Sequence, residues 1–200
     1  KAKPSILGEA VAQNKVGQYL IAPVRYEQKQ GQEYAIEGKL AIACGSLGGF
    51  GGFISKEFRI HDYFLGRSNC EQFLREHFTI PIDSENPIFV NGYKNVEKSL
   101  FLSTSGRLQI IPIFDKKQNK PYMPTFSNGI SWPTIEKRKI DDYRKQIKRR
   151  TEKIINSMTD FKPIPKLLLW IGLKILITGK IADGVINYVT ESLSKHKLLD

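Results

Sequence analysis

Cysteine and histidine are scarce in this 200-residue chain, and their scarcity excludes several kinds of site. The two cysteines, Cys44 and Cys70, have no C-x-x-C spacing, so we expect neither a disulfide framework nor a zinc cluster. The three histidines are isolated, and no group of His, Cys and acidic residues has the spacing of metal ligands. We therefore predict reduced thiols in a cytoplasmic protein that carries no metal and no cofactor.

Long apolar runs are also missing. The longest run is LLLWIGLKILI at residues 167–177, and it contains Lys174, whereas a membrane-spanning helix needs about 20 apolar residues. The first ten residues, KAKPSILGEA, lack the apolar segment of a signal peptide. We therefore predict no transmembrane helix.

Positive charge is in excess, with a formal net charge of +11. Residues 134–158 hold nine basic and four acidic residues, so this stretch alone contributes +5 (nine minus four). Such a surface suits an anionic partner, and lipid headgroups would contribute about 1 kcal/mol per basic residue. The same charges could equally form the solvated face of a structural helix. Nucleic acid is the weaker choice, because no aromatic residues alternate with the basic ones. The candidates for a lipid surface, at the inner membrane, are Lys137, Arg138, Lys145, Lys148, Arg149 and Lys153.

Hydrophobic spacing in the first 114 residues predicts a few short elements. We expect a strand at 18–24, a loop at 28–33, and a hairpin at 99–114 around a Ser-Gly turn. Residues 38–66 are apolar but rich in glycine, which leaves their structure ambiguous. A helix is expected to begin at Ser68, because Glu71 follows at the spacing of a capping box.

The remainder of the chain is expected to be helical after an irregular loop at 115–133. One helix would begin at Thr134 and reach Met158, and a buried helix would end at Gly179. A last amphipathic helix follows. Its expected inward residues are Ile181, Val185, Tyr188, Val189 and Leu193.

The stretch GSLGGFGGF at residues 45–53 allows three interpretations. A phosphate-binding loop is disfavoured, because Ile54 stands where the dinucleotide pattern has its third glycine and no Lys-Ser/Thr pair follows. A nucleophile turn could expose Ser46, with Asp183 as a distant carboxylate, but Cys44 occupies a position that requires a small residue. Close packing of backbones, which only glycine allows, is the favoured interpretation.

His61 and Asp62 could suggest a catalytic base and the residue that orients it. Because adjacent residues on a helix do not face each other, we expect their side chains to diverge. Asp62 would then pair with Arg59 or Arg67.

Residues 40–78 carry a more specific pattern. A glycine–phenylalanine run is followed by residues that fit F-R-x-H-D-[YF]-x-L-G-R-x-N-x-x-x-F-L, and this region resembles the C-terminal part of bacterial patatin-like phospholipases. The likeness continues more weakly at 108–114, in the Ser-Trp-Pro at 131–133, and in the terminal helices. The matching residues are Phe58, Arg59, His61, Asp62, Tyr63, Leu65, Gly66, Arg67, Asn69, Phe73 and Leu74.

The resemblance implies a lipid acyl hydrolase of α/β fold with a Ser-Asp dyad, supplied by a G-x-S-x-G turn and a later D-G-[GA]. In family members these elements precede the region seen here, so no catalytic residue is carried over. The chain is expected to be a predominantly helical α+β C-terminal portion whose partner is the catalytic N-terminal part of the same protein. Residues 1–114 would pack on that hydrolase core, 115–133 would form a loop, and 134–200 would form the helical region.

Two alternatives remain open from the sequence. One is a self-contained serine hydrolase that uses Ser46 and Asp183. The other is a basic helical module that binds nucleic acid, which would show a steep dependence of affinity on salt.

Overall fold

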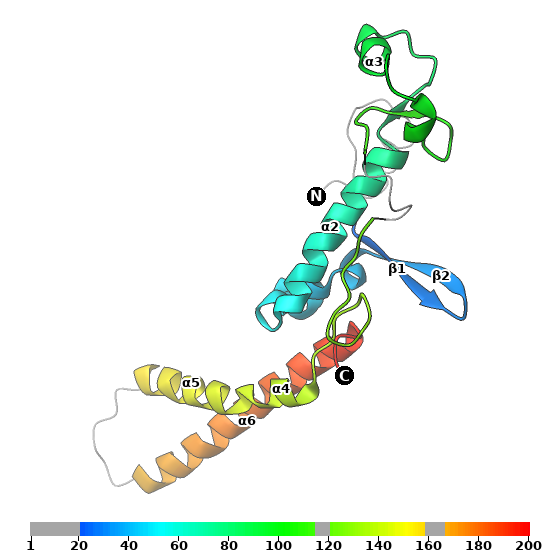
Figure 1. Cartoon of the computed structure of the whole chain (residues 1–200). Coiled ribbons are helices and arrows are strands. Elements are labelled where there is room, and N and C mark those ends of the chain that lie inside the picture. Colours follow the sequence, from blue (N-terminus) through cyan, green and yellow to red (C-terminus); the bar gives the residue numbers. More distant parts are fainter. Residues whose placement is uncertain (1–20, 115–120, 159–166) are drawn as a thin grey trace, which may run out of the picture. The chain divides into compact units, whose positions relative to one another are not determined.

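The computed structural model describes residues 21–114, 121–158 and 167–200. Helices and two small antiparallel sheets make this an α+β protein, as the sequence predicts (Figure 1). The chain forms two compact units that do not follow chain order. Unit 1 comprises residues 1–38 and 64–122, and unit 2 comprises residues 39–63 and 123–200.

Unit 1 contains a regular β-hairpin. Strand β1 (Val24–Lys29) pairs with β2 (Gln32–Glu37), and the turn between them consists of Gln30 and Gly31, both with positive φ. Two consecutive residues with positive φ are typical of a tight hairpin turn. The predicted loop at 28–33 is therefore only this two-residue turn. Of the strand predicted at 18–24, residues 18–20 lie outside the described part of the chain. Residues 21–23 are not in a strand, so the prediction is wrong there, and only Val24 belongs to β1.

A small core of unit 1 surrounds the two-stranded sheet of β3 (Thr79–Ile80) and β4 (Leu108–Gln109). The helix α3 (Pro87–Gly92) and the 3₁₀ turn η4 (Lys98–Phe101) lie between these strands in the chain. The hairpin expected at 99–114 is reduced to one bridge between residues 102 and 108. The buried residues of this core are Tyr93, Phe101 and Leu108.

Helix α2 (Lys56–Glu76) is longer than the sequence indicated. Ser55 Oγ accepts the Glu57 N–H at 3.2 Å, so the helix has its polar cap far upstream of the predicted start at Ser68. The first turns of α2 were not predicted from the sequence, because glycine-rich residues precede the helix and Gly66 lies inside it. Residues 56–63 of α2 belong to unit 2 and residues 64–76 to unit 1.

Unit 2 ends in three helices, α4 (Lys137–Asp141), α5 (Tyr143–Met158) and α6 (Leu167–Lys195). Helices α5 and α6 lie side by side (Figure 1). The predicted end at Gly179 is wrong, because α6 continues through it. An interior glycine costs a helix only about 1 kcal/mol relative to alanine, which packing along the helix can outweigh. Thr134 is not the N-cap of α4, since Glu136 holds that place.

The predicted inward face of α6 is largely wrong. Leu193 is fully buried, but Val185 is 39% exposed and Tyr188 is 63% exposed, while Ala182 and Ile186 are buried instead. Of the segment 115–133, which the sequence predicts to be a loop, the structure describes residues 121–133, and these form neither helix nor strand. The core of unit 2 consists of Ala43, Phe58, Trp132, Ile135, Ile140, Ile186, Leu193 and Leu198.

Candidate functional site

The glycine-rich stretch forms a series of 3₁₀ turns, η1 (Gly38–Ala41), η2 (Ala43–Gly49) and η3 (Gly51–Phe53). A Cβ atom at Gly51 would collide with Ser46 Oγ, and one at Gly52 would lie 2.9 Å from Cys44 Sγ. These glycines therefore allow η3 to lie close to Ser46 and Cys44 of η2 within unit 2. This agrees with the interpretation that the glycines serve close packing.

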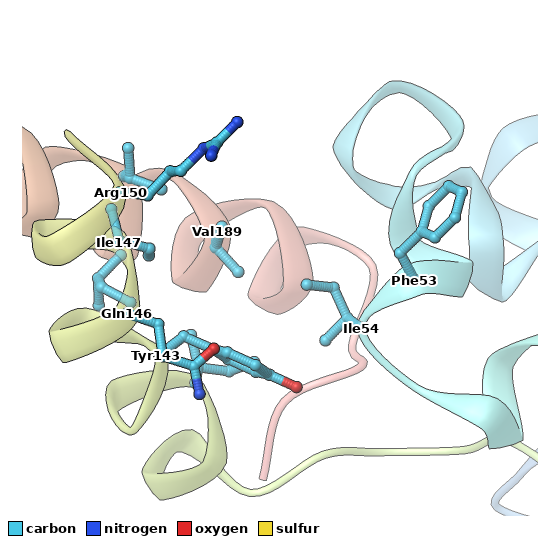
Figure 2. Close-up of a pocket in the computed structure, with 10 residues that line it drawn as sticks. Phe53, Ile54, Tyr143, Gln146, Ile147, Arg150 and Val189 are labelled. Atoms are coloured by element: carbon cyan, nitrogen blue, oxygen red, sulfur yellow. The ribbon is translucent and has the colours of Figure 1, made fainter. Parts of the chain in front are cut away.

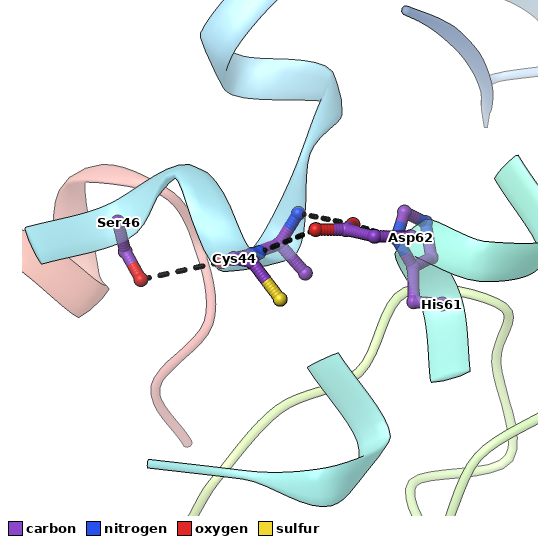
Figure 3. A network of polar contacts seen from close by, with 5 residues as sticks. Cys44, Ser46, His61 and Asp62 are labelled. Carbon is purple, nitrogen blue, oxygen red and sulfur yellow. Dashed lines mark hydrogen bonds and ion pairs between the residues drawn. The ribbon is translucent and has the colours of Figure 1, made fainter. Parts of the chain in front are cut away.

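Asp62 fixes this stretch to α2 (Figure 3). Its Oδ1 accepts the backbone N–H of Ala43 and its Oδ2 accepts the N–H of Cys44, both at 2.8 Å. His61 Nδ1 also lies 2.8 Å from Asp62 Oδ1. The expected divergence of His61 and Asp62 is therefore wrong, because the carboxylate of Asp62 turns back toward the imidazole. The expected pairing of Asp62 with an arginine is wrong for Arg59, which donates to the Gly52 carbonyl instead.

The pKa values of Asp62 and of the neighbouring Cys44 are both shifted. Burial alone would raise the pKa of Asp62, but the hydrogen bonds from His61, Cys44 and Ala43 outweigh burial and hold this pKa below its usual value. The pKa of the Cys44 thiol is raised to about 12, first by burial and then by its hydrogen bond with Asp62 and the negative charge of Asp62. Because the thiolate is the nucleophilic form, Cys44 is unsuited to attack a substrate at neutral pH.

His61 connects α2 to a distant part of the sequence. Its side chain is 1% exposed, and its ring meets Trp132 edge to face with 4.8 Å between the ring centroids. Trp132 Nε1 in turn donates to the Lys197 carbonyl at 2.8 Å. The His-Asp pair and the Ser-Trp-Pro segment, which the sequence resemblance had singled out separately, thus meet in one core. We call this group, Asp62, His61 and Trp132, the anchor cluster.

The structure does not bring Ser46 and Asp183 together. Ser46 is fully buried, and its Oγ donates to the Ala43 carbonyl at 3.2 Å. Its φ and ψ of −60° and 156° lie in an ordinary extended region, unlike the strained turn that exposes a nucleophile. Asp183 is exposed on α6 and accepts from Arg144 Nε at 2.5 Å, an ion pair that lowers the pKa of Asp183. The geometry of a Ser46–Asp183 dyad is absent among the described residues.

The six lipid-surface candidates lie on α4 and α5 of unit 2. Five of them are exposed and Lys148 is half-buried. None forms an ion pair with a described residue, in contrast to two of their neighbours. Lys139 pairs with Glu136 at 3.2 Å, and Arg144 pairs with Asp183. The candidates thus provide positive charge on this helical surface that no described acid neutralises.

Beside this basic surface runs an apolar groove of about 400 Å³ between α5, α6 and η3 (Figure 2). Arg150 and Tyr143 lie at opposite ends of its α5 wall. Sequence reasoning missed the groove, because it assumed that Val185 and Val189 on α6 point into a closed core. The lining residues are Phe53, Ile54, Ile140, Tyr143, Gln146, Ile147, Arg150, Val185, Ile186 and Val189.

No helix in the described ranges is long and apolar enough to cross a bilayer. Within the same ranges, no group of three or more His, Cys, Asp and Glu side chains could hold a metal ion.

Comparison with known proteins gives one curated relative. The chain is similar to the "Uncharacterized protein y4iI" of Sinorhizobium fredii, with 42% identity over 114 residues that make up 56% of this chain. The match covers 16% of the relative's own length, so the chain spans only a small part of that longer protein. No family model matches the chain, and no solved structure matches it at a significant level.

Proposed function

We propose that this chain is the C-terminal portion of a bacterial patatin-like lipid acyl hydrolase. It completes the fold of the enzyme, while phospholipid ester hydrolysis is performed by a Ser-Asp dyad that precedes it in the sequence. Its partner is the catalytic part of the same protein, and the whole enzyme works in the cytoplasm at the inner membrane.

One observation carries this proposal. Phe58, His61 and Asp62, three residues of the family-like string, contribute to the core of unit 2 or to its anchor cluster. Asp62 accepts backbone N–H groups and contacts His61, whose ring meets Trp132, and Asp62 faces no described nucleophile with a lowered pKa. Side chains with such contacts stabilise the fold of unit 2, as we expect for a segment whose enzyme has its catalytic residues elsewhere in the sequence.

The second part of the proposal is that α4 and α5 hold the enzyme against an anionic lipid surface. The supporting observation is the set of six basic side chains without a described acidic partner. Attraction of this kind is additive and falls with ionic strength, because mobile ions screen exposed charges.

Phospholipid hydrolysis by the full-length protein tests the proposal. We expect Ser46→Ala and Asp183→Asn to keep hydrolysis within about twofold of the unmodified enzyme, since neither side chain acts in the reaction. Replacement of the serine in an upstream G-x-S-x-G turn should remove activity. Loss of turnover in a folded Ser46→Ala protein would refute the assignment.

A further inference from the structure

We propose that the groove between α5, α6 and η3 binds the aliphatic chain of a single medium-chain carboxylate, whose head group is held by Arg150. This site goes beyond the proposed function, because it assigns a ligand to unit 2 and stands without the hydrolase assignment. The ligand is a monomer in solution rather than a bilayer or a protein.

The size and lining of the groove suit one small ligand. Pockets for small molecules have volumes of roughly 300–1,000 Å³ and combine apolar walls with a few polar groups. This groove, at about 400 Å³, lies at the lower end of that range. Its walls carry Ile54, Ile147 and Val189, and Figure 2 shows Ile147 and Ile54 on opposite sides with Val189 of α6 between them. An elongated aliphatic chain would fill such a space.

Some of the apolar side chains that line the groove are exposed to solvent. Phe53 is 82% exposed and Val185 is 39% exposed, although both line an apolar groove. Removing such apolar side chains from water lowers the free energy of the complex. Each methylene of the ligand that becomes buried should strengthen binding about fourfold.

Charge complementarity identifies the head group as an anion. Arg150 lines the groove and forms no ion pair with a described residue. The positions three and four residues away on the helix are Gln146, Ile147, Lys153 and Ile154, so the helix itself supplies no carboxylate within reach. A guanidinium matches a carboxylate in a two-point hydrogen bond. Tyr143 lies at the other end of the same wall, and Gln146 and Ile147 lie between it and Arg150 (Figure 2).

Calorimetric titration of the 200-residue chain with octanoate, decanoate and dodecanoate, each below its micelle concentration, tests this site. We expect one ligand per chain and an affinity that rises about fourfold per methylene. Arg150→Gln should weaken decanoate binding at least tenfold, because a charge-assisted hydrogen bond is lost. The matched control is Arg149→Gln, which removes the same charge one residue away, outside the lining, and should change affinity less than twofold.

A second variant blocks the apolar part. Val185→Trp fills the groove from a partly exposed position and should abolish binding while the circular dichroism spectrum stays unchanged. If this variant fails to fold, the comparison of Arg150→Gln with Arg149→Gln decides alone.

Several results would overturn the proposal. These are binding that never saturates, equal losses in the two arginine variants, and unchanged affinity in folded Val185→Trp. A dimer in sedimentation equilibrium that Val185→Trp disrupts would identify a second copy as the occupant instead. Sedimentation with anionic vesicles tests the proposed function and not the groove. Vesicle binding without decanoate binding would therefore refute only the proposal of a ligand in the groove.

Discussion

At the scale of single residues, Asp62 is the side chain on which the glycine-rich stretch depends most. Its two oxygens receive two backbone N–H groups and the imidazole of His61. These donors belong to separate elements, η2 and α2, so one carboxylate joins them. The function of this acid is therefore to hold the chain in place.

We predict that Asp62→Asn lowers the free energy of unfolding by roughly 2–3 kcal/mol, because an amide offers one acceptor and turns a donor toward a second N–H. Urea unfolding followed by circular dichroism measures this loss. Asp83→Asn is the matched control, since Asp83 is exposed and should change stability by less than about 0.5 kcal/mol. Equal stability of the two variants would contradict the anchoring role.

Acid should destabilise the protein partly through the same group. The pKa of Asp62 is lower in the folded than in the unfolded chain, so its contribution is complete above the unfolded value of about 3.9. That contribution is lost as the pH falls from there through the lower folded pKa. Unfolding free energies between pH 6 and pH 2 should therefore fall less steeply below pH 4 in Asp62→Asn than in the unmodified chain. Parallel curves would show that Asp62 does not titrate differently on folding.

The two thiols should differ in reactivity. Cys70 is exposed, whereas burial and Asp62 raise the pKa of Cys44 to about 12. Alkylation by iodoacetamide at pH 8 should be complete at Cys70 while Cys44 stays largely unmodified, as peptide mass spectrometry would report. Alkylation at Cys44 as rapid as at Cys70 would mean that this thiol is neither buried nor held by Asp62.

At the scale of elements, the glycines of η3 and those of α6 have different roles. A Cβ atom at Gly51 meets Ser46 and the backbone of the preceding turn, whereas one at Gly184 meets nothing within 4 Å. We predict that Gly51→Ala lowers the melting temperature. Gly184→Ala should raise it, because alanine favours a helix by about 1 kcal/mol relative to glycine. The two variants carry the same chemical change, so a melting temperature raised by both would contradict the close approach at Gly51.

Element boundaries were the part of the fold that the sequence predicted least well. Gly179 has the local properties of a helix end, but α6 continues through it and packs along α5. Ser68 and Glu71 show capping-box spacing in the middle of α2, where no free N–H groups remain to be capped. The α+β class and the loop before α4 were predictable because they depend on composition, not on distant contacts.

The anchor cluster could be predicted only as a set of unconnected residues. His61 and Trp132 are far apart in the sequence, and no periodicity relates them. The resemblance marked both segments, but their contact depends on how the chain returns to α2. The groove was unpredictable for a similar reason, since it depends on which residues of α6 stay uncovered by α5.

At the scale of the whole molecule, we propose that the position of the positive charge on α4 and α5, and not its total, determines binding to an anionic lipid surface. We predict that Lys145→Glu combined with Arg149→Glu reduces sedimentation with anionic vesicles by at least tenfold. The basis is about 1 kcal/mol of attraction per basic residue and comparable repulsion from each new acid. Vesicles of neutral lipid should show little binding by any variant.

The control for this variant changes the net charge equally. Lys56→Glu combined with Lys94→Glu alters two exposed lysines outside the basic helical surface, and it also lowers the net charge by four. Equal losses in both double variants would show that total charge, not the surface of α4 and α5, determines lipid binding.

The central claim is that the reactive serine lies outside residues 1–200 and that the anchor cluster serves as scaffold. Labelling of the full-length protein with a fluorophosphonate probe, followed by mass spectrometry of its peptides, tests this claim most directly. The account predicts a modified serine in sequence that precedes Lys1 and an unmodified Ser46. A probe adduct on Ser46, removed by Ser46→Ala, would contradict it.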